Sequence, residues 1–153
     1  HLNNKFSLMI LGEGPLKDDL LQQIKSLGLS DRISLLGFRS NPWALYAAAD
    51  CFILPSRWEG MPNAVLESLA CGTPVIVTKE SGGVSEILEH IDSSALKIVD
   101  TGDYFITEMS KIRRKERITN NFSLLPDIYK VDKAITIFEK WLDEIDVRSK
   151  NSI

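Results

Sequence analysis

Two glutamates with seven residues between them, Glu59 and Glu67, stand where a loop is expected to pass into a helix. A carboxylate accepts hydrogen bonds from two hydroxyl groups at once, which is what a sugar diol offers. The residues between the two acids begin with G-M-P-N over 60–63, which suits a loop followed by a first helical turn. A helix start carries free N–H groups and a partial positive charge, so it favours a phosphate. These residues therefore suit a ligand that has hydroxyl and phosphate groups together.

The chain around these acids predicts a strand, a loop, a helix and a second strand. The apolar run at residues 51–54 predicts the first strand, and the run at 74–77 predicts a buried second one. We expect the helix over residues 62–70, with Pro62 at its first helical position and Gly72 capping its end. The loop and the helix start would then carry both acids.

The same alternation of strands and helices continues along the chain. We expect further strands at residues 6–11, 33–36 and 95–99, and further helices at residues 15–27, 42–48, 84–89, 102–114 and 131–145. This order predicts an α/β fold with a Rossmann-like parallel sheet flanked by helices. Ligands bind such sheets at the carboxyl ends of the strands. We therefore expect the loops at 12–15, 37–41, 55–62 and 79–84 to lie at one edge.

Three helices have apolar residues at helical spacing. The helix before Gly28 has an apolar stripe made of Leu16, Leu20, Leu21, Ile24 and Leu27. In the helix at 102–114 we expect the apolar side chains to face inward, namely Tyr104, Ile106, Met109 and Ile112. The final helix has an apolar face that we expect to be partly exposed, made of Val131, Ile135, Phe138, Leu142 and Ile145.

The length, composition and net charge restrict the class of protein. The chain has 153 residues, 44% of them hydrophobic, with a net charge of −3, which suits one domain and argues against a general nucleic-acid binder.

We expect Cys51 and Cys71 to be reduced thiols in apolar surroundings. The sequence has no D-x-D motif, so we expect no dedicated metal site. The chain begins with His1 and not with Met, and we expect it to be part of a longer protein.

Several motifs in order resemble one enzyme family. They are G-E-G-P at 12–15, L-L-G-F at 35–38, A-A-D-C-F-I-L-P-S ending at 56, E-G-M-P-N-A-V-L-E at 59–67 and G-G-V-S-E at 82–86. The spacing of the two acids is similar to the E-x7-E signature of retaining glycosyltransferases of the GT-B fold, glycosyltransferase family 4 (glycosyl transferases group 1). The matching motifs extend over about residues 5–90. The resemblance implies half of a GT-B fold, its C-terminal donor-binding domain at residues 1–147, with a disordered tail at 148–153.

The resemblance also implies roles for individual residues. The donor would be a nucleotide-diphospho sugar, UDP- or GDP-linked, and no other cofactor is implied. Glu67 would bind the ribose hydroxyls, and Glu59 would contact the donor sugar close to the anomeric carbon, as the candidate catalytic residue. The residues implied to lie along the diphosphate and the sugar are Gly60, Met61, Pro62 and Asn63.

Two further loops are implied to lie at the nucleotide end of the cleft. Gly12 and Gly14 form either a tight turn between strand and helix or a backbone surface beside the nucleotide, and both interpretations stay open. Phe38 and Arg39 follow the second strand, where the resemblance places the nucleotide base. Either side chain could stack on the base, or Phe38 could pack in the loop while Arg39 is solvated.

The activity implied is transfer of a hexose-type sugar to a glycan or glycolipid acceptor with retention, as in bacterial polysaccharide assembly. In the family, an upstream Arg and Lys neutralise the diphosphate, and an N-terminal domain holds the acceptor. This sequence starts after the point where those residues would stand, so we expect the isolated chain to be inactive. We expect a cytoplasmic location, with any peripheral contact with a membrane made through the full-length protein.

Other classes of protein share parts of this pattern. A nucleotide-sugar epimerase half has a similar fold, although the sequence at 59–67 argues against it. A non-catalytic nucleotide-sugar-binding or interaction module fits the same residues. A receiver-like domain would need an acidic cluster after the first strand, where this chain has Gly-Glu-Gly-Pro.

Overall fold

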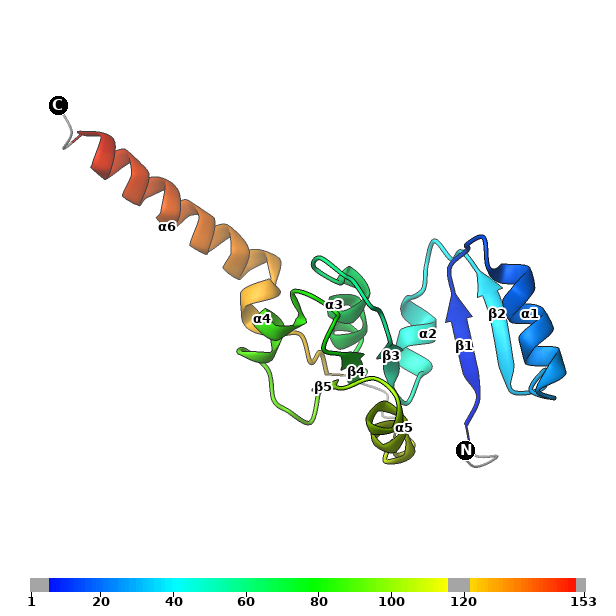
Figure 1. The fold of residues 1–153 in the computed structure, drawn as a ribbon. Coiled ribbons are helices and arrows are strands. Elements are labelled where there is room, and N and C mark those ends of the chain that lie inside the picture. The colour runs from blue at the N-terminus through cyan, green and yellow to red at the C-terminus, as the bar shows by residue number, and fades with distance from the viewer. Residues whose placement is uncertain (1–5, 116–121, 151–153) are drawn as a thin grey trace. The chain divides into compact units, whose positions relative to one another are not determined.

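The computed structural model describes residues 6–115 and 122–150, with side chains for 6–115 and 122–143. The chain divides into two compact units, His1–Ala44 and Leu45–Ile153 (Figure 1). Each unit is described by itself. The assignment of residues 1–147 to one domain stays a prediction. Of the expected tail, residues 148–150 are helical, and 151–153 lie outside the described residues.

The first unit contains a pair of parallel strands and one helix. Strand β1 (Leu8–Leu11) pairs with β2 (Ile33–Gly37), and α1 (Lys17–Ser26) connects them. Gly28 ends α1 with a φ of +65°, as its position in the sequence predicts. The helix begins two residues later than we expected from Pro15.

The apolar stripe of α1 is only partly covered within this unit. Ile24 is buried, whereas the other four members are exposed, namely Leu16, Leu20, Leu21 and Leu27. The expected helix is therefore present, and Ile24 is the residue of its stripe that is buried.

The second unit is built on three parallel strands. Strand β4 (Val75–Thr78) lies between β3 (Phe52–Leu54) and β5 (Leu96–Val99), and all four of its residues are buried. A continuous apolar run of this kind is expected for a strand covered on both faces. All pairings in both sheets are parallel, which confirms the α/β class.

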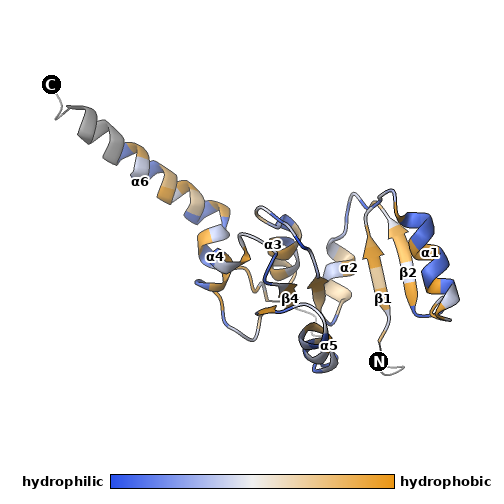
Figure 2. Cartoon of the chain, in the orientation of Figure 1, coloured by the Kyte–Doolittle hydropathy of each residue, from blue (hydrophilic) through white to orange (hydrophobic). Residues whose placement is uncertain are grey.

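The helices that follow β3, β4 and β5 in the chain pack on this sheet, and Figure 2 shows the apolar strands between more polar helix surfaces. They are α3 (Asn63–Ala70), α4 (Val84–Leu88) and α5 (Asp103–Ser110). The chain also contains α2 (Trp43–Ala48, which crosses the division between the units), a 3₁₀ turn (Asp127–Tyr129) and α6 (Val131–Lys150), which contacts that turn. The core contains side chains from α3, β4, α4, β5 and the residue before β5, namely Val65, Leu69, Val75, Val77, Val84, Ile87, Ala95 and Leu96.

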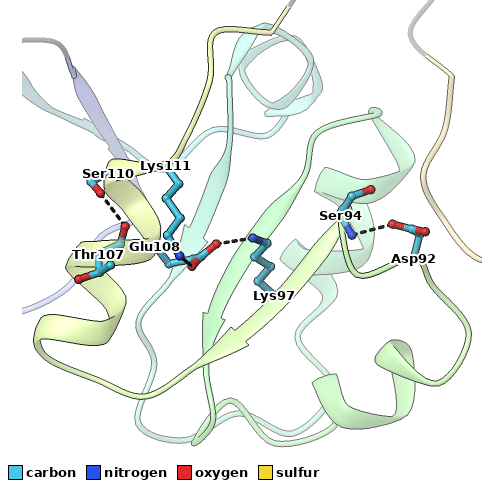
Figure 3. Close-up of polar contacts among 7 residues, drawn as sticks. All are labelled: Asp92, Ser94, Lys97, Thr107, Glu108, Ser110 and Lys111. Carbon is cyan, nitrogen blue, oxygen red and sulfur yellow. Dashed lines mark hydrogen bonds and ion pairs between the residues drawn. The ribbon is translucent and has the colours of Figure 1, made fainter.

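The rotation of α5 differs from the one we expected. Phe105 is buried, whereas Tyr104 is 72% exposed and Ile106 is also exposed. Figure 3 shows that Glu108 of α5 forms ion pairs with Lys97 of β5 and with Lys111. Because residues three apart share a helix face, Glu108 and Phe105 lie on the same side of α5. Hydrogen bonds from Lys111 and Lys97 lower the pKa of Glu108.

The long helix α6 has the exposed apolar face that its sequence predicts. The exposed members are Val131, Ile135, Ile137, Phe138, Trp141 and Leu142. The rings of Phe138 and Trp141 lie 5.9 Å apart between centroids. The side chain of Ile145 lies outside the described residues. Among the described helices, none combines the length and apolar character needed to cross a membrane.

Candidate functional site

The loop with the first glutamate connects the end of β3 to the start of α3, at residues 55–62 (Figure 1). Glu59 is exposed in this loop. The Ser56 hydroxyl donates a hydrogen bond to its Oε1 over 2.8 Å. A carboxylate has two oxygens and about four acceptor positions, so the contact with Ser56 orients Glu59 and leaves acceptor capacity for ligand hydroxyls.

A buried hydroxyl network fixes the base of this loop. Thr78, the last residue of β4, donates from Oγ1 to the carbonyl of Ser56. The hydroxyl oxygens of Thr78 and Ser81 are 3.0 Å apart, and Ser81 donates to the carbonyl of Leu54 over 3.5 Å. Both hydroxyl residues are almost fully buried. The loops that follow β3 and β4 are therefore bonded to each other.

A pair of glycines allows the same two loops to touch through their backbones. The amide of Gly83 donates to the carbonyl of Gly60 over 2.8 Å. Gly82 has a φ of +53°, and a Cβ built there would lie 1.9 Å from the carbonyl oxygen of Glu59. Only glycine allows this backbone angle and this approach together. The loop at 55–62 thus has a fixed shape next to Glu59.

The start of α3 differs by one residue from the expected position. Pro62 is buried and is the residue before the helix, with ψ of 91°, so Asn63 is the first helical residue. The amide of Val65 donates to the carbonyl of Pro62 over 2.9 Å. No side chain caps this helix start. Its first amides therefore have no side-chain acceptor, and such an uncapped helix start suits an anionic group.

The second glutamate has a neighbour that the sequence did not reveal. Glu67 is half-buried on α3, and its charge lies near the side chain of Tyr46 on α2. Burial, together with the nearby Glu67 charge, raises the pKa of Tyr46 to about 12. The tyrosine is therefore neutral at physiological pH.

The glycine loop of the first unit lies beside the end of β2. The amide of Gly12 donates to the carbonyl of Gly37 over 2.9 Å, and Gly12 has a φ of +109°. Gly12 and Gly14 both line a hollow of about 290 Å³, which also has apolar walls from β1, β2 and α1. Phe38 is 72% exposed and Arg39 is also exposed, and neither lines this hollow.

The expected clustering of loops is found inside each unit. The loops at 12–15 and 37–41 meet in the first unit, and those at 55–62 and 79–84 meet in the second. The second unit contains the candidate residues Glu59, Gly60, Met61, Pro62, Asn63 and Glu67, and the first unit contains the others.

The residues that sequence reasoning missed are Tyr46, Ser56, Thr78 and Ser81. For three of these, the signal was a hydroxyl residue within two positions of the end of a predicted strand, or directly before Gly82.

Comparison with known proteins identifies the family. The family described as glycosyl transferases group 1 matches residues 1–121, and the chain belongs to this family. Its α/β fold is that of a GT-B glycosyltransferase domain.

In the parts of the chain that the structure describes, no three metal-ligating side chains form a cluster that could hold an ion.

Individual proteins agree with this assignment. The N-acetylgalactosamine-N,N'-diacetylbacillosaminyl-diphospho-undecaprenol 4-alpha-N-acetylgalactosaminyltransferase of Campylobacter jejuni is 40% identical over 99 residues, covering 65% of this chain and 27% of the relative. The structure of TarM aligns with a TM-score of 0.69 at 21% identity, over 92% of this chain and 30% of TarM. Anabaena HepE in complex with UDP-glucose aligns with a TM-score of 0.55 at 28% identity, over 72% and 31% of the two chains. The chain thus spans about a third or less of each of these proteins.

Proposed function

We propose that this chain is the donor-binding part of a retaining glycosyltransferase that transfers a hexose-type sugar from a nucleotide-diphospho sugar to a glycan or glycolipid. The observation that carries the proposal is the loop at 55–62, which is clamped by Thr78 and Gly82 and ends at an uncapped helix start. The complex of Anabaena HepE with UDP-glucose supports a UDP-linked donor. The acceptor class is supported by the lipid-linked substrate in the name of the Campylobacter relative.

Each part of such a donor has a matching group in the second unit. The diphosphate would lie against the amides at the start of α3, where the partial positive charge of the helix favours it. Glu59, oriented by Ser56, would accept hydroxyl groups of the sugar near the anomeric carbon. Glu67 would accept the two ribose hydroxyls. In the first unit, the loops with Gly12, Gly14, Phe38 and Arg39 are the proposed contacts for the base.

The role proposed for the protein in the chemical step is electrostatic. The bond between the anomeric carbon and the diphosphate oxygen breaks, the acceptor oxygen bonds to that carbon on the same face, and the acceptor proton passes to the leaving diphosphate. Amides fixed at the α3 start would stabilise the charge that develops on the leaving group. Glu59 would hold the sugar in place, and we do not assign it as a nucleophile.

We propose that transfer needs more of the protein than these residues, because the chain spans only about a third or less of the relatives that it matches. The isolated chain should then show no transfer and at most weak nucleotide binding. We also propose a cytoplasmic location. Contacts with a lipid-linked acceptor would be made largely by the rest of the protein.

The experiment that tests this function measures transfer by the whole protein that contains this chain. Glu59→Gln should lower kcat by roughly 100-fold to 1,000-fold, as expected when a preorganised polar contact at the reacting centre is lost. Glu89→Gln, which neutralises an exposed acid of the same unit, is the matched control and should keep the original rate. NMR of the product should show the anomeric configuration of the donor. Full activity of Glu59→Gln, or an inverted product, would contradict the proposal.

A further inference from the structure

An exposed tryptophan lies next to the acid that would contact the donor sugar. Trp58 is 90% exposed, which is the highest value among the large hydrophobic side chains of the described residues. The next residue is Glu59, and both belong to the loop between β3 and α3. Single exposed apolar side chains are common on protein surfaces, so exposure by itself does not indicate a site. The geometry of the loop around Trp58 therefore decides the argument.

The turn that contains Trp58 is closed by a side-chain contact. The hydroxyl of Ser56 donates a hydrogen bond to Oε1 of Glu59 over 2.8 Å, which joins residues three apart. Arg57 and Trp58 lie between these two and are both exposed, so they form the outer end of the turn. Residues 59–62 separate Trp58 from the start of α3. A donor held by Glu59 and by that helix start therefore leaves the indole available to a second molecule.

Backbone contacts with the loop after β4 hold this turn on both sides of Trp58. On the N-terminal side, Thr78 donates a hydrogen bond to the carbonyl of Ser56. On the C-terminal side, the amide of Gly83 donates to the carbonyl of Gly60 over 2.8 Å. The backbone that positions the indole is thus fixed before a ligand arrives. Binding to a fixed surface costs less ordering entropy than binding to a flexible loop.

An exposed indole suits the ring of a sugar. The face of an aromatic ring has partial negative charge, whereas the C–H groups on the apolar face of a pyranose have partial positive charge. The two flat surfaces therefore attract each other and exclude water between them. A tryptophan side chain has only two rotatable bonds, so it loses little freedom when a ligand stacks on it.

We propose that Trp58 is the surface on which the sugar ring of the acceptor stacks, which brings an acceptor hydroxyl toward the donor sugar at Glu59. The inference rests on the proposed function, and it adds an acceptor contact inside this part of the protein. The ligand class is a pyranose at the end of a glycan or glycolipid. Stacking uses the face of the ring and not its pattern of hydroxyls, so Trp58 places the ring and other contacts select the sugar.

Other occupants of this surface lead to different results. If Trp58 packed against the rest of the protein, removing the indole would lower the melting temperature and impair the use of donor and acceptor alike. If Trp58 stacked on the donor sugar, its removal would raise the KM of the donor. An acceptor surface affects the KM of the acceptor and leaves kcat unchanged, as is typical of a contact made equally in the ground state and the transition state.

The test measures transfer by the whole protein that contains this chain. The donors are UDP-glucose, UDP-galactose and GDP-mannose, and the acceptor probes are octyl glycosides of glucose, galactose, N-acetylglucosamine and N-acetylgalactosamine. Trp58→Ala should raise the KM of the acceptor about tenfold, the value of one lost stacking contact. The kcat, the donor KM and the melting temperature should stay at their original values. Tyr104→Ala removes an exposed ring from α5 as the matched control and should change none of these quantities.

Two further variants separate stacking from general apolar contact. Trp58→Phe keeps a flat ring and should stay within about threefold of the original acceptor KM. Trp58→Leu is apolar without a flat face and should be as weak as Trp58→Ala. After labelling with 5-fluorotryptophan, the ¹⁹F signal that Trp58→Phe removes should shift when the acceptor probe is added and not when UDP is added. The signals of Trp43 and Trp141 serve as internal references.

The outcomes distinguish this inference from the proposed function. If the protein uses a donor and Trp58→Ala keeps the acceptor KM, the inference is wrong and the proposed function stands. Full rescue by Trp58→Leu, or equal losses for donor and acceptor with a lower melting temperature, would also overturn the inference. The same holds if a donor is hydrolysed and none of the four pyranose probes accepts its sugar. If the protein neither binds nor uses any of the donors, both proposals are wrong.

Discussion

Replacing Gly82 with alanine tests the contact between the two loops at the proposed donor site. Gly82 has a φ of +53°, and its Cβ would lie 1.9 Å from the carbonyl oxygen and 2.8 Å from the carbonyl carbon of Glu59. Both atoms belong to the backbone, so rotation of a side chain cannot relieve the clash. One of the two loops must therefore move.

The size of the movement follows from the contact distance. Ordinary van der Waals contact begins at about 3.4 Å, so the loops must separate by about 1.5 Å near Glu59. A misplacement of about 1 Å at a reacting centre can cost roughly 100-fold. The positive φ adds about 1–2 kcal/mol of backbone strain. We therefore expect Gly82→Ala to lower transfer by roughly 100-fold while the protein stays folded.

The assay combines three measurements on the whole protein that contains this chain. Transfer rates give the functional loss, urea denaturation gives the change in the free energy of unfolding, and amide shifts locate the structural change. The shifts should extend across the loops to residues 56–63, because the amide of Gly83 is bonded to the carbonyl of Gly60.

Gly28→Ala is the matched control, because Gly28 has a φ of +65° and its Cβ would meet no atom within 4 Å. It should lose a similar amount of stability from backbone strain and keep its transfer rate. If Gly82→Ala transferred sugar at the original rate, or if its amide shifts stopped at the neighbouring residues, the argument from loop contact would be refuted.

The remaining predictions concern stability and thiol chemistry. Thr78→Val should lower the free energy of unfolding by about 1–3 kcal/mol in urea denaturation, because it leaves the partly buried carbonyl of Ser56 without its donor, and an unchanged midpoint would contradict this. Phe105→Ala should lower the free energy of unfolding by about 3–5 kcal/mol, and Tyr104→Ala by no more than about 0.5 kcal/mol. Equal losses would mean that Phe105 is not the ring that α5 buries. Burial raises the pKa of the Cys51 thiol to about 12, above its ordinary 9.0. The contribution of the protonated thiol to folding stability is therefore complete below pH 9 and is lost as pH rises through 9 to 12. At pH 8.5 this thiol should be alkylated more slowly in the native protein than in urea, and equal rates would exclude the raised pKa.

Local sequence signals predicted the elements of this fold well. The apolar runs located β3, β4 and β5 to within two residues of their ends, because short apolar segments next to proline and glycine have few other interpretations. Gly72 ends α3 with a φ of +70°, as a left-handed cap requires. The start of α3 was wrong by one residue, because Pro62 fits both the residue before a helix and its first position.

Contacts between distant segments could not be predicted from the sequence. Tyr46 and Glu67 are 21 positions apart, and no local pattern indicates that α2 and α3 bring them together. The predicted inward face of α5 was wrong for Tyr104 and Ile106, which are exposed, whereas Phe105 is buried on the side where Glu108 pairs with Lys97 of β5. The roles of Thr78 and Gly82 required the geometry of two loops, although their positions after a strand were visible.

The most direct test of the central claim is an amide NMR titration of the whole protein with UDP, GDP and ADP. If the chain binds the donor as proposed, one nucleotide should shift Gly60, Met61 and Asn63 together with Phe38 and Glu67. Glu67→Ala should remove most of that response. Shifts that avoid residues 59–67, or no response at millimolar concentrations of all three nucleotides, would contradict donor binding at this loop.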